Sequence, residues 1–302
     1  MQTQLQTTQT DVWWRLTRPH TLTASFVPVF IGTALALYEG QVNILLFFAM
    51  LVASILIQTA TNMFNEYYDY VRGLDNEHSV GIGGTIVRDG VQPKTVRNLA
   101  FVCYLISVAL GVYICMESSW WVAVIGLVCM AVGYFYTAGP LPISYTPFGE
   151  VFSGVFMGPV IILITCYIQT GSLSMSNFYI SLSSCLLIGA INFANNIRDL
   201  DGDKEGGRRT LAILLGRPRS ITLLSVIFAV AFAWMVLLVI MQTVTPWALL
   251  VLFSVPKAYQ AIRQFRGKTQ AFEMMPAMKS TAQLNTLFGI LLTAALLLGH
   301  YI

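Results

Sequence analysis

The sequence predicts an all-α membrane protein, and three observations support that prediction. Hydrophobic residues make up 56% of the 302-residue chain and charged residues only 10%, less than half the share of about 25% found in soluble domains. The mean hydropathy is +0.69, so too little polar surface remains to cover a soluble particle of 33.4 kDa. The apolar residues also form continuous runs of about 20 positions, which is the length of a membrane-spanning helix. A disordered chain, a collagen-like fibre and a disulfide scaffold are excluded by the same composition.

Nine apolar segments predict nine transmembrane helices. Strands are excluded because the runs do not alternate and are too long. The breaks between segments carry helix-ending residues, such as Gly139-Pro140. The whole chain, 1–302, is expected to form one domain, with residues 1–20 as an interfacial arm that Trp13 and Trp14 anchor. The segments are 21–39, 43–66, 97–116, 119–138, 149–169, 176–197, 219–241, 245–263 and 280–301.

The charged residues separate onto one face of this nine-helix arrangement. All 17 Lys and Arg residues fall on the side that carries the N-terminus, together with every acidic residue except Glu39 and Glu117. Positive charge marks the cytoplasmic side of a membrane protein. We therefore expect the N-terminus in the cytoplasm and the C-terminus outside. The partners expected from this distribution are the lipid bilayer and small substrates, not nucleic acid, and the sequence leaves the oligomeric state open.

Two breaks on the charged side contain related polar motifs. Both follow the pattern N-x-x-N-x-x-x-D, beginning at Asn62 in the first copy and at Asn192 in the second. A constant displacement between the copies indicates a parallel internal repeat whose motifs leave the membrane on the same face. Positions i, i+3, i+4 and i+7 lie on one side of a helix, so each motif forms a polar stripe. The stripes are Asn62, Asn65, Glu66 and Asp69 in one copy and Asn192, Asn195, Asn196, Asp199 and Asp203 in the other.

Carboxylates at these positions indicate a site for a divalent cation and an anion. They are costly near a membrane unless they are paired, hydrated or bound to a cation. Mg²⁺ uses a few carboxylates and completes its coordination with water and substrate phosphates. Nearby bases would face a diphosphate held by the metal. The bases are Arg72, Arg88, Arg198, Lys204, Arg208 and Arg209. The alternative is that these acids and bases only pair with one another at the membrane surface.

Over nearly its whole length the chain resembles the UbiA superfamily of intramembrane prenyltransferases. The two acidic motifs, at 65–75 and 195–203, carry the resemblance. The flanking stretches are similar to the MenA branch, which acts on 1,4-dihydroxy-2-naphthoate. They are Arg18-Pro19-His20-Thr21-Leu22, the Gly81 to Thr85 loop, Tyr136 to Pro142, and Gly207-Arg208-Arg209-Thr210.

Three positions depart from the general superfamily pattern. The chain has Glu66 where the first motif usually has aspartate, so the carboxylate is one methylene longer. The third acid of the motif would fall at Gly73, and here the nearest acid is Asp75, as in the MenA-like pattern. Ile143-Ser144 occupy the region where hydroxybenzoate-type relatives carry lysine. This last departure disfavours a hydroxybenzoate acceptor.

The resemblance implies transfer of a polyprenyl group from a polyprenyl diphosphate to 1,4-dihydroxy-2-naphthoate with loss of carbon dioxide, giving demethylmenaquinone in the cytoplasmic (inner) membrane. Two Mg²⁺ ions are expected to bridge the diphosphate, in a site open to the cytoplasm. The metal ligands implied are Asn65, Glu66, Asp69, Asp75, Asn195, Asp199 and Asp203, and the catalytic residues are Asp69, Asp199, Arg72, Arg198 and Lys204. The prenyl and carbocation pocket implied is Asn62, Tyr67, Tyr68, Tyr70, Tyr134, Phe135, Tyr136 and Asn192.

Two other functions compete with this interpretation. A related enzyme could use another aromatic acceptor, 4-hydroxybenzoate or homogentisate. A cation-coupled secondary transporter would also use intramembrane carboxylates and internal repeats. Transporter sites lie near the bilayer midplane on broken helices, whereas both acidic stripes here fall at cytoplasmic helix ends. The position of the stripes therefore favours the prenyltransferase.

Overall fold

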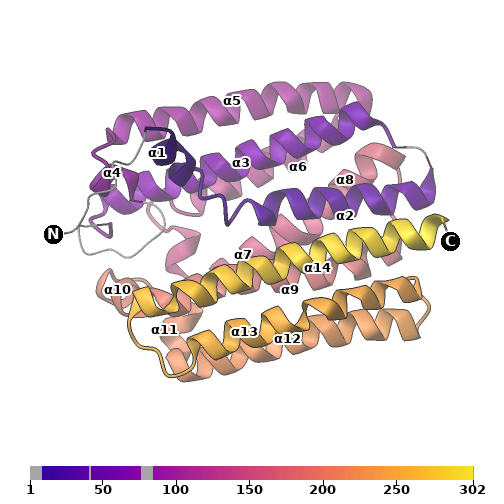
Figure 1. The fold of residues 1–302 in the computed structure, drawn as a ribbon. Coiled ribbons are helices and arrows are strands. Elements are labelled where there is room, and N and C mark those ends of the chain that lie inside the picture. The colour runs from indigo at the N-terminus through magenta and orange to yellow at the C-terminus, as the bar shows by residue number, and fades with distance from the viewer. Residues whose placement is uncertain (1–8, 41, 76–83, 302) are drawn as a thin grey trace.

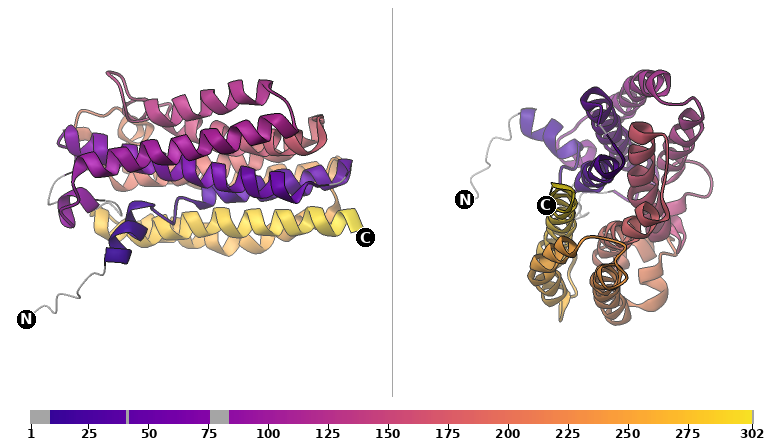
Figure 2. Two further views of the ribbon diagram at one scale, coloured as in Figure 1. Left: turned by 90° about the horizontal axis from the view of Figure 1, so that it is seen from above. Right: turned by 90° about the vertical axis from the view of Figure 1, so that its right-hand side faces the viewer.

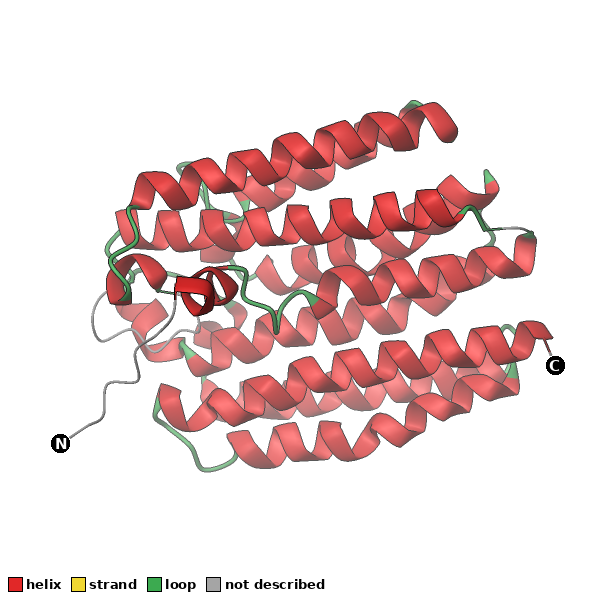
Figure 3. Cartoon of the chain, turned by 45° about the horizontal axis from the view of Figure 1, so that its top comes forward, coloured by secondary structure: helices red, strands yellow, loops and turns green. Residues whose placement is uncertain are grey.

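Long helices running side by side make up the computed structural model, which describes residues 9–40, 42–75 and 84–301. Figure 3 shows helices and loops, with no strand among these residues, so the all-α prediction is confirmed. Six helices are long and apolar enough to cross a membrane. They are Ile44–Val71, Pro93–Glu117, Gly149–Thr170, Met175–Arg198, Arg217–Ile240 and Ala271–Tyr301.

The other three expected segments form shorter or composite helices. Thr23–Tyr38 and Trp121–Phe135 are apolar but shorter than the six. The segment expected at 245–263 begins as a 3₁₀ helix, η3 (Pro246–Ser254), and continues as α13 (Val255–Phe265). Each expected segment therefore overlaps a helix, although length and composition alone identify six as spans.

The short helices gather at one end of the bundle. Figure 1 shows α1, α4, α10 and α11 at this end and the last described residue at the opposite end. The remaining elements in chain order are α1 (Gln9–Leu16), α2 (Thr23–Glu39), α3 (Ile44–Val71), α4 (Thr85–Arg88), α5 (Pro93–Glu117), α6 (Trp121–Phe135), η1 (Ile143–Tyr145), α7 (Gly149–Val155), the π-helical turn η2 (Phe156–Val160), α8 (Ile161–Thr170), α9 (Met175–Arg198), α10 (Leu200–Glu205), α11 (Leu211–Leu215), α12 (Arg217–Ile240), η4 (Ala271–Met274) and α14 (Met275–Tyr301).

Local sequence signals fix where several of these helices begin and end. The side chain of Asn43 caps α3 by accepting hydrogen bonds from the N–H groups of the first turn, and Ser174 caps α9 in the same way. Pro93 opens α5, where its missing N–H costs nothing. Gly171 ends α8 with φ of +73°, a conformation that favours glycine. These signals place the helix ends without help from tertiary packing.

Helix α9 lies at the centre of the contacts that hold the bundle together. It packs against α7, η2, α12 and α14, and α2 packs between α14 and α8 (Figure 2). Gly154 and Gly158 allow α7 and η2 to approach α9 closely, because a Cβ atom there would lie 2.6 and 2.8 Å from backbone atoms of Cys185. Two small residues four positions apart are typical of a close helix-packing contact, and these glycines form one. Close packing of α7 and η2 on α9 thus fixes the helix that carries the second acidic motif.

Candidate active site

A cavity of about 1020 Å³ begins at the end of the bundle where the short helices gather. Its lining on α3 runs from Met50 to Asp69, which corresponds to about 28 Å along the helix at 1.5 Å per residue. Near Asp69 the walls are polar and charged. Farther along, the walls come from α5, α6 and α8 and are mostly apolar. One cavity thus combines a charged end with a long apolar extension.

The first motif supplies one wall of the charged end. Asn62 donates hydrogen bonds to the Thr17 carbonyl and the Thr21 hydroxyl, both at 2.9 Å, and so holds the chain that enters α2. Asn65 accepts a hydrogen bond from Arg18 at 2.7 Å and donates to Asp69 at 3.2 Å. All three motif residues line the cavity. Asp75 lines it too, just after the end of α3.

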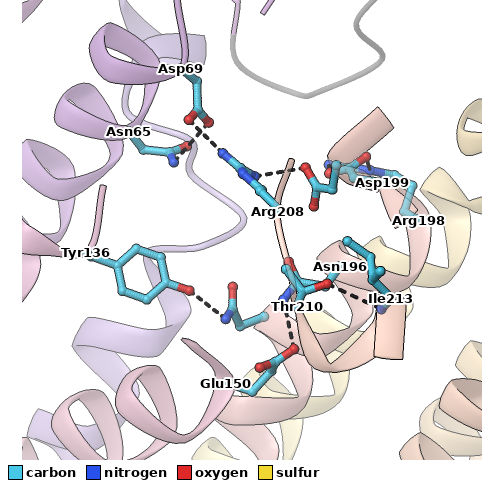
Figure 4. Close-up of polar contacts among 12 residues, drawn as sticks. Asn65, Asp69, Tyr136, Glu150, Asn196, Arg198, Asp199, Arg208, Thr210 and Ile213 are labelled. Carbon is cyan, nitrogen blue, oxygen red and sulfur yellow. Dashed lines mark hydrogen bonds and ion pairs between the residues drawn. The ribbon is translucent and has the colours of Figure 1, made fainter. Parts of the chain in front are cut away.

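The second motif supplies the opposite wall from α9 and α10. Asn192 donates to the hydroxyl of Tyr136 at 2.6 Å, and Asn196 donates to Glu150 at 2.8 Å (Figure 4). Asp199 accepts two hydrogen bonds from Arg198, at 2.6 and 2.5 Å. The motif residues Asn192, Asn195, Asn196, Asp199 and Asp203 all line the cavity. The fold therefore brings both motifs to one site.

Arg208 joins the two motifs. Its guanidinium donates to Asp69 at 2.6 Å and to Asp203 at 2.9 Å, and the three side chains are only 10–12% exposed. Figure 4 shows Arg208 between Asp69 on one side and Arg198 and Asp199 on the other. The ring of Tyr145 lies against the same guanidinium, 5.2 Å away. Arg208 was predicted to face a diphosphate, and the structure places it at the centre of the charged end.

Glu66 occupies a different place from the one expected for a metal ligand. It is fully buried and lies outside the cavity lining. Its carboxylate accepts hydrogen bonds from the Thr85 hydroxyl at 2.5 Å and the Ile86 N–H at 3.1 Å. The reason is angular, since position 66 lies about 60° around the helix axis from Asp69 and about 100° from Asn65. Glu66 thus faces α4 and does not reach the cavity where the other expected metal ligands of the first motif lie.

Four of the expected anion-binding bases also lie outside the cavity lining. Arg72 donates to the carbonyl groups of Thr137 and, at 2.8 Å, of Gly139, so it holds the loop after α6. The other three are Arg88, on the short helix α4, and Lys204 and Arg209, which are exposed. Arg198 and Arg208 do line the cavity. Of the glycine-rich loop, Gly81, Ile82 and Gly83 lie outside the described residues.

The aromatic residues predicted to line a carbocation pocket also fall into two groups, one at the cavity and one outside its lining. Tyr136 lines the cavity, whereas Tyr67, Tyr68, Tyr70, Tyr134 and Phe135 do not. Tyr68 and Tyr134 share a hydrogen bond of 2.7 Å and pack with Phe64 in the interface of α3, α5 and α6. The cavity takes other aromatic walls instead, from Trp120, Phe152 and Phe156. Tyr68 and Tyr134 therefore serve packing, whereas Tyr70 is exposed.

Sequence reasoning missed two segments that line the charged end. Arg18 and His20 line the cavity from the segment before α2, and Thr269, Gln270 and Ala271 line it from the connection between α13 and α14. Arg18 has a positive φ of +51°, which directs the chain around its contact with Asn65. A signal was present, because Arg18 and His20 belong to a stretch that carries the family resemblance. No pattern singled out residues 269–271.

Burial and repulsion raise the pKa of two carboxyl groups at the charged end. Burial, with the neighbouring charge of Asp69, raises the pKa of Asp75 to about 6. Burial also raises the pKa of Asp203 to about 6, with Asp199 and Asp69 adding to the effect and Arg208 opposing it. Asp69 and Asp203 in turn hold the pKa of Arg208 above its usual range. Crowded, buried carboxylates of this kind are stabilised when they bind a cation.

The donors at the charged end fit Mg²⁺ in kind. They are carboxylate and amide oxygens, and the second oxygen of Asp203 is buried with no hydrogen-bond partner. Among the described residues, no three His, Cys, Asp or Glu side chains gather closely enough to hold a metal as they stand. Arg208 separates Asp69 from Asp203, and Asp199 is turned toward Arg198. The residue types therefore suit the ion, and Arg208 sets their present spacing.

Comparison with known proteins identifies the family to which this chain is similar. The model of the UbiA prenyltransferase family matches residues 25–274. The chain is 56% identical over 291 residues to 1,4-dihydroxy-2-naphthoate octaprenyltransferase of Bacillus subtilis, covering 96% of this chain and 94% of that protein. It is 30% identical over 286 residues to UbiA prenyltransferase domain-containing protein 1 of Danio rerio, covering 93% of this chain and 82% of the relative.

Solved structures share the fold at low sequence identity. A UbiA homologue from Aeropyrum pernix superposes with a TM-score of 0.68 at 14% identity, covering 93% of this chain and 98% of the other. A UbiA homologue from Archaeoglobus fulgidus, bound to DMAPP and Mg²⁺, superposes with a TM-score of 0.66 at 13% identity, covering 94% and 99%. The family model spans most of the chain, and the helical fold matches as well. The chain belongs to the UbiA prenyltransferase family.

Proposed function

We propose that this chain transfers a polyprenyl group from a polyprenyl diphosphate to 1,4-dihydroxy-2-naphthoate with decarboxylation, forming demethylmenaquinone for menaquinone biosynthesis. The observation that carries the proposal is the 56% identity, over nearly the whole of both chains, to the Bacillus subtilis octaprenyltransferase acting on that acceptor. The cavity supports it, because a charged end and a long apolar extension match the two parts of a polyprenyl diphosphate.

The residues of the charged end would prepare the allylic C–O bond for cleavage. Asp69, Asp199 and Asp203 would hold Mg²⁺, which when bound neutralises the charge that develops on the leaving diphosphate. Arg208 and Arg198 would bind the diphosphate oxygens with charge-assisted hydrogen bonds. The apolar walls on α5, α6 and α8 would exclude water from the prenyl cation. We propose that two Mg²⁺ ions would bind at this site with the diphosphate.

The same proposal includes a membrane topology. The nine helical segments would each cross the bilayer, as one domain in the cytoplasmic membrane with the N-terminus inside and the C-terminus outside. Two observations support it: the last described residue lies at the end of the bundle opposite α1, and all 17 bases fall on one side in the nine-helix arrangement. The charged end of the cavity would then open to the cytoplasm.

Ser144 supports the choice of acceptor. It lines the cavity in the region, Ile143-Ser144, where hydroxybenzoate-type relatives carry lysine, and it is 8% exposed. A small neutral side chain leaves more room there than a lysine and places no charge near the acceptor. This difference favours a bulkier two-ring acceptor over 4-hydroxybenzoate.

The test is an acceptor comparison with the purified protein in detergent. We expect Mg²⁺, octaprenyl diphosphate and 1,4-dihydroxy-2-naphthoate to give a prenylated, decarboxylated product by mass spectrometry, together with released carbon dioxide. The same mixture with 4-hydroxybenzoate or homogentisate should give little product, and EDTA should abolish the reaction. Preference for either single-ring acceptor, or full activity in EDTA, would overturn the proposal.

A further inference from the structure

Arg208 holds the two acidic motifs in a single ion-pair network. Its Nη2 lies 2.6 Å from Oδ1 of Asp69, on α3, and its Nη1 lies 2.9 Å from Oδ1 of Asp203, on α10. Among the ion pairs of the described residues, these two are the ones that connect the first motif to the second. The guanidinium therefore bridges a carboxylate of each motif, as a metal cation between the motifs would.

Arg208 and a divalent ion would need the same oxygen atoms. Mg²⁺ binds carboxylate oxygens at about 2.0–2.1 Å in a nearly octahedral shell, which leaves no room for a guanidinium on the same side of the same oxygens. The two cations would also repel each other at that separation in a site that is about nine-tenths buried. Binding of the metal between Asp69 and Asp203 thus requires Arg208 to leave them.

The local backbone permits that movement. Arg208 follows Gly206 and Gly207, and Gly207 has a φ of +78°, which favours glycine. After Arg208 the chain is fixed, because the N–H of Arg209 donates to the carbonyl of Tyr145 at 2.9 Å and Thr210 caps α11. The Nε of Arg208 is buried with no partner, so the present position leaves one donor unused. A diphosphate could use that donor together with the other two.

We propose that Arg208 makes metal binding and diphosphate binding depend on each other. Without diphosphate, Arg208 competes with the divalent cation for Asp69 and Asp203. A diphosphate at the mouth of the cavity attracts Arg208, which frees the two carboxylates for the metal. The coupling is reciprocal, so the metal strengthens diphosphate binding by the same factor. The proposal rests on the proposed function in one respect, that the donor carries a diphosphate.

The first test uses the metal alone. Mn²⁺ binding to the full-length protein in detergent is measured from the EPR signal of free Mn²⁺, with no diphosphate present. Removing the competing charge in Arg208→Gln should tighten Mn²⁺ binding by about tenfold or more. Arg15→Gln is the matched control, because Arg15 forms an ion pair of 2.8 Å with Asp89 away from the cavity, and its Mn²⁺ affinity should equal that of the unmodified protein. Unchanged or weaker Mn²⁺ binding by Arg208→Gln would overturn the proposal.

Arg208→Lys keeps the test decisive if the glutamine variant does not fold. Lysine retains the charge, but a single ammonium cannot bridge two carboxylates as the planar guanidinium does. Its Mn²⁺ affinity should therefore lie between those of the unmodified protein and Arg208→Gln. If the glutamine variant is lost, a lysine variant that binds Mn²⁺ no more tightly than the unmodified protein rejects the competition.

The second test measures the coupling. Mn²⁺ titrations are repeated with saturating geranyl S-thiolodiphosphate, an unreactive prenyl diphosphate analogue, after subtraction of Mn²⁺ bound by the analogue in buffer. The gain in Mn²⁺ affinity should be several-fold larger in the unmodified protein than in Arg208→Gln. Equal gains in Mn²⁺ affinity in the two proteins would contradict the proposed coupling. Failure of the protein to bind the analogue at all would instead contradict the proposed function, while the metal-alone titration would still decide the competition.

Discussion

The carboxylate of Glu66 accepts a hydrogen bond of 2.5 Å from the hydroxyl of Thr85, the first residue of α4. It also accepts from the Ile86 N–H, so it satisfies a donor at the start of that short helix. This contact explains a departure from the superfamily pattern, because the additional methylene of glutamate lengthens its reach toward α4. A residue that reads as a metal ligand in the sequence thus fastens the segment after the first motif.

Substitutions at Glu66 should distinguish a role in holding α4 from a role in binding the metal. Glu66→Gln keeps an oxygen acceptor at the same reach, so the Mg²⁺ concentration that gives half-maximal activity should stay the same. Glu66→Asp is too short to hold Thr85, and limited proteolysis should cut faster between residues 84 and 92. A rise of about tenfold or more in the Mg²⁺ requirement of Glu66→Gln, the cost typical of losing a metal-site residue, would contradict this placement.

Asp69 and Asp199 should be essential for turnover while leaving the fold intact. Both line the charged end of the cavity on opposite walls. We expect Asp69→Asn and Asp199→Asn each to lower kcat by about 10²-fold or more, because each removes a charge that would hold the metal. The apparent Tm of each should fall, because each variant loses an ion pair with a buried arginine, but each should still unfold in a single cooperative transition. Asp89→Asn, which loses an ion pair away from the cavity, should keep its activity, and persistence of full activity in both motif variants would reject the site.

The apolar extension should limit the length of the prenyl donor. Gly111 on α5 and Gly126 on α6 line it, and a Cβ atom at either position would meet nothing within 4 Å. A larger side chain therefore enters the cavity without disturbing the helices. Gly111→Phe should lower kcat/KM for octaprenyl diphosphate by on the order of tenfold relative to geranyl diphosphate.

Gly111→Ala is the control for that measurement, because a methyl group takes little of the space. It should leave the ratio of the two donors close to that of the unmodified protein. Equal losses for the short and the long donor in Gly111→Phe would mean that the prenyl tail does not occupy this part of the cavity.

His20 should make stability fall in mild acid. Burial, with the charges of Arg18 and Arg198, lowers the pKa of His20 to about 4 from its usual value of 6.5. Between pH 4 and pH 6.5, His20 binds a proton in the unfolded chain but not in the folded chain. The effect of His20 on stability is therefore most favourable above about pH 6.5, and stability decreases as the pH falls toward 4. His20→Gln should lose less of its apparent Tm between pH 7 and pH 5 than the unmodified protein does.

The apparent Tm can be measured with a thiol-reactive dye. Cys115 and Cys166 are buried in the folded chain, so the dye reaches them when the chain unfolds. His300→Gln is the control, because His300 is exposed at the far end of α14. It should follow the unmodified protein over the same pH range. An identical pH dependence in His20→Gln would show that another group is responsible.

Much of this protein follows from its sequence alone, because the decisive signals are local. Apolar runs predict helices wherever they are long enough, and Asn43, Pro93 and Ser174 mark helix starts through their own side chains. The spacing of Asn62, Asn65 and Asp69 places them on one side of α3 whatever surrounds it. Repetition of that spacing on α9 was enough to predict that two polar stripes form one site.

The tertiary structure decided which neighbour each side chain meets. Periodicity gives an angle around a helix axis but not the element packed at that angle, so Glu66 meets α4 and Arg72 meets the loop after α6, while Arg208 reaches Asp69 from 139 residues away. Charge type could not distinguish these three, since each is a charged residue beside an acidic motif. Only the packing of distant segments determines which charges are used to hold the fold and which remain at the cavity to bind a ligand.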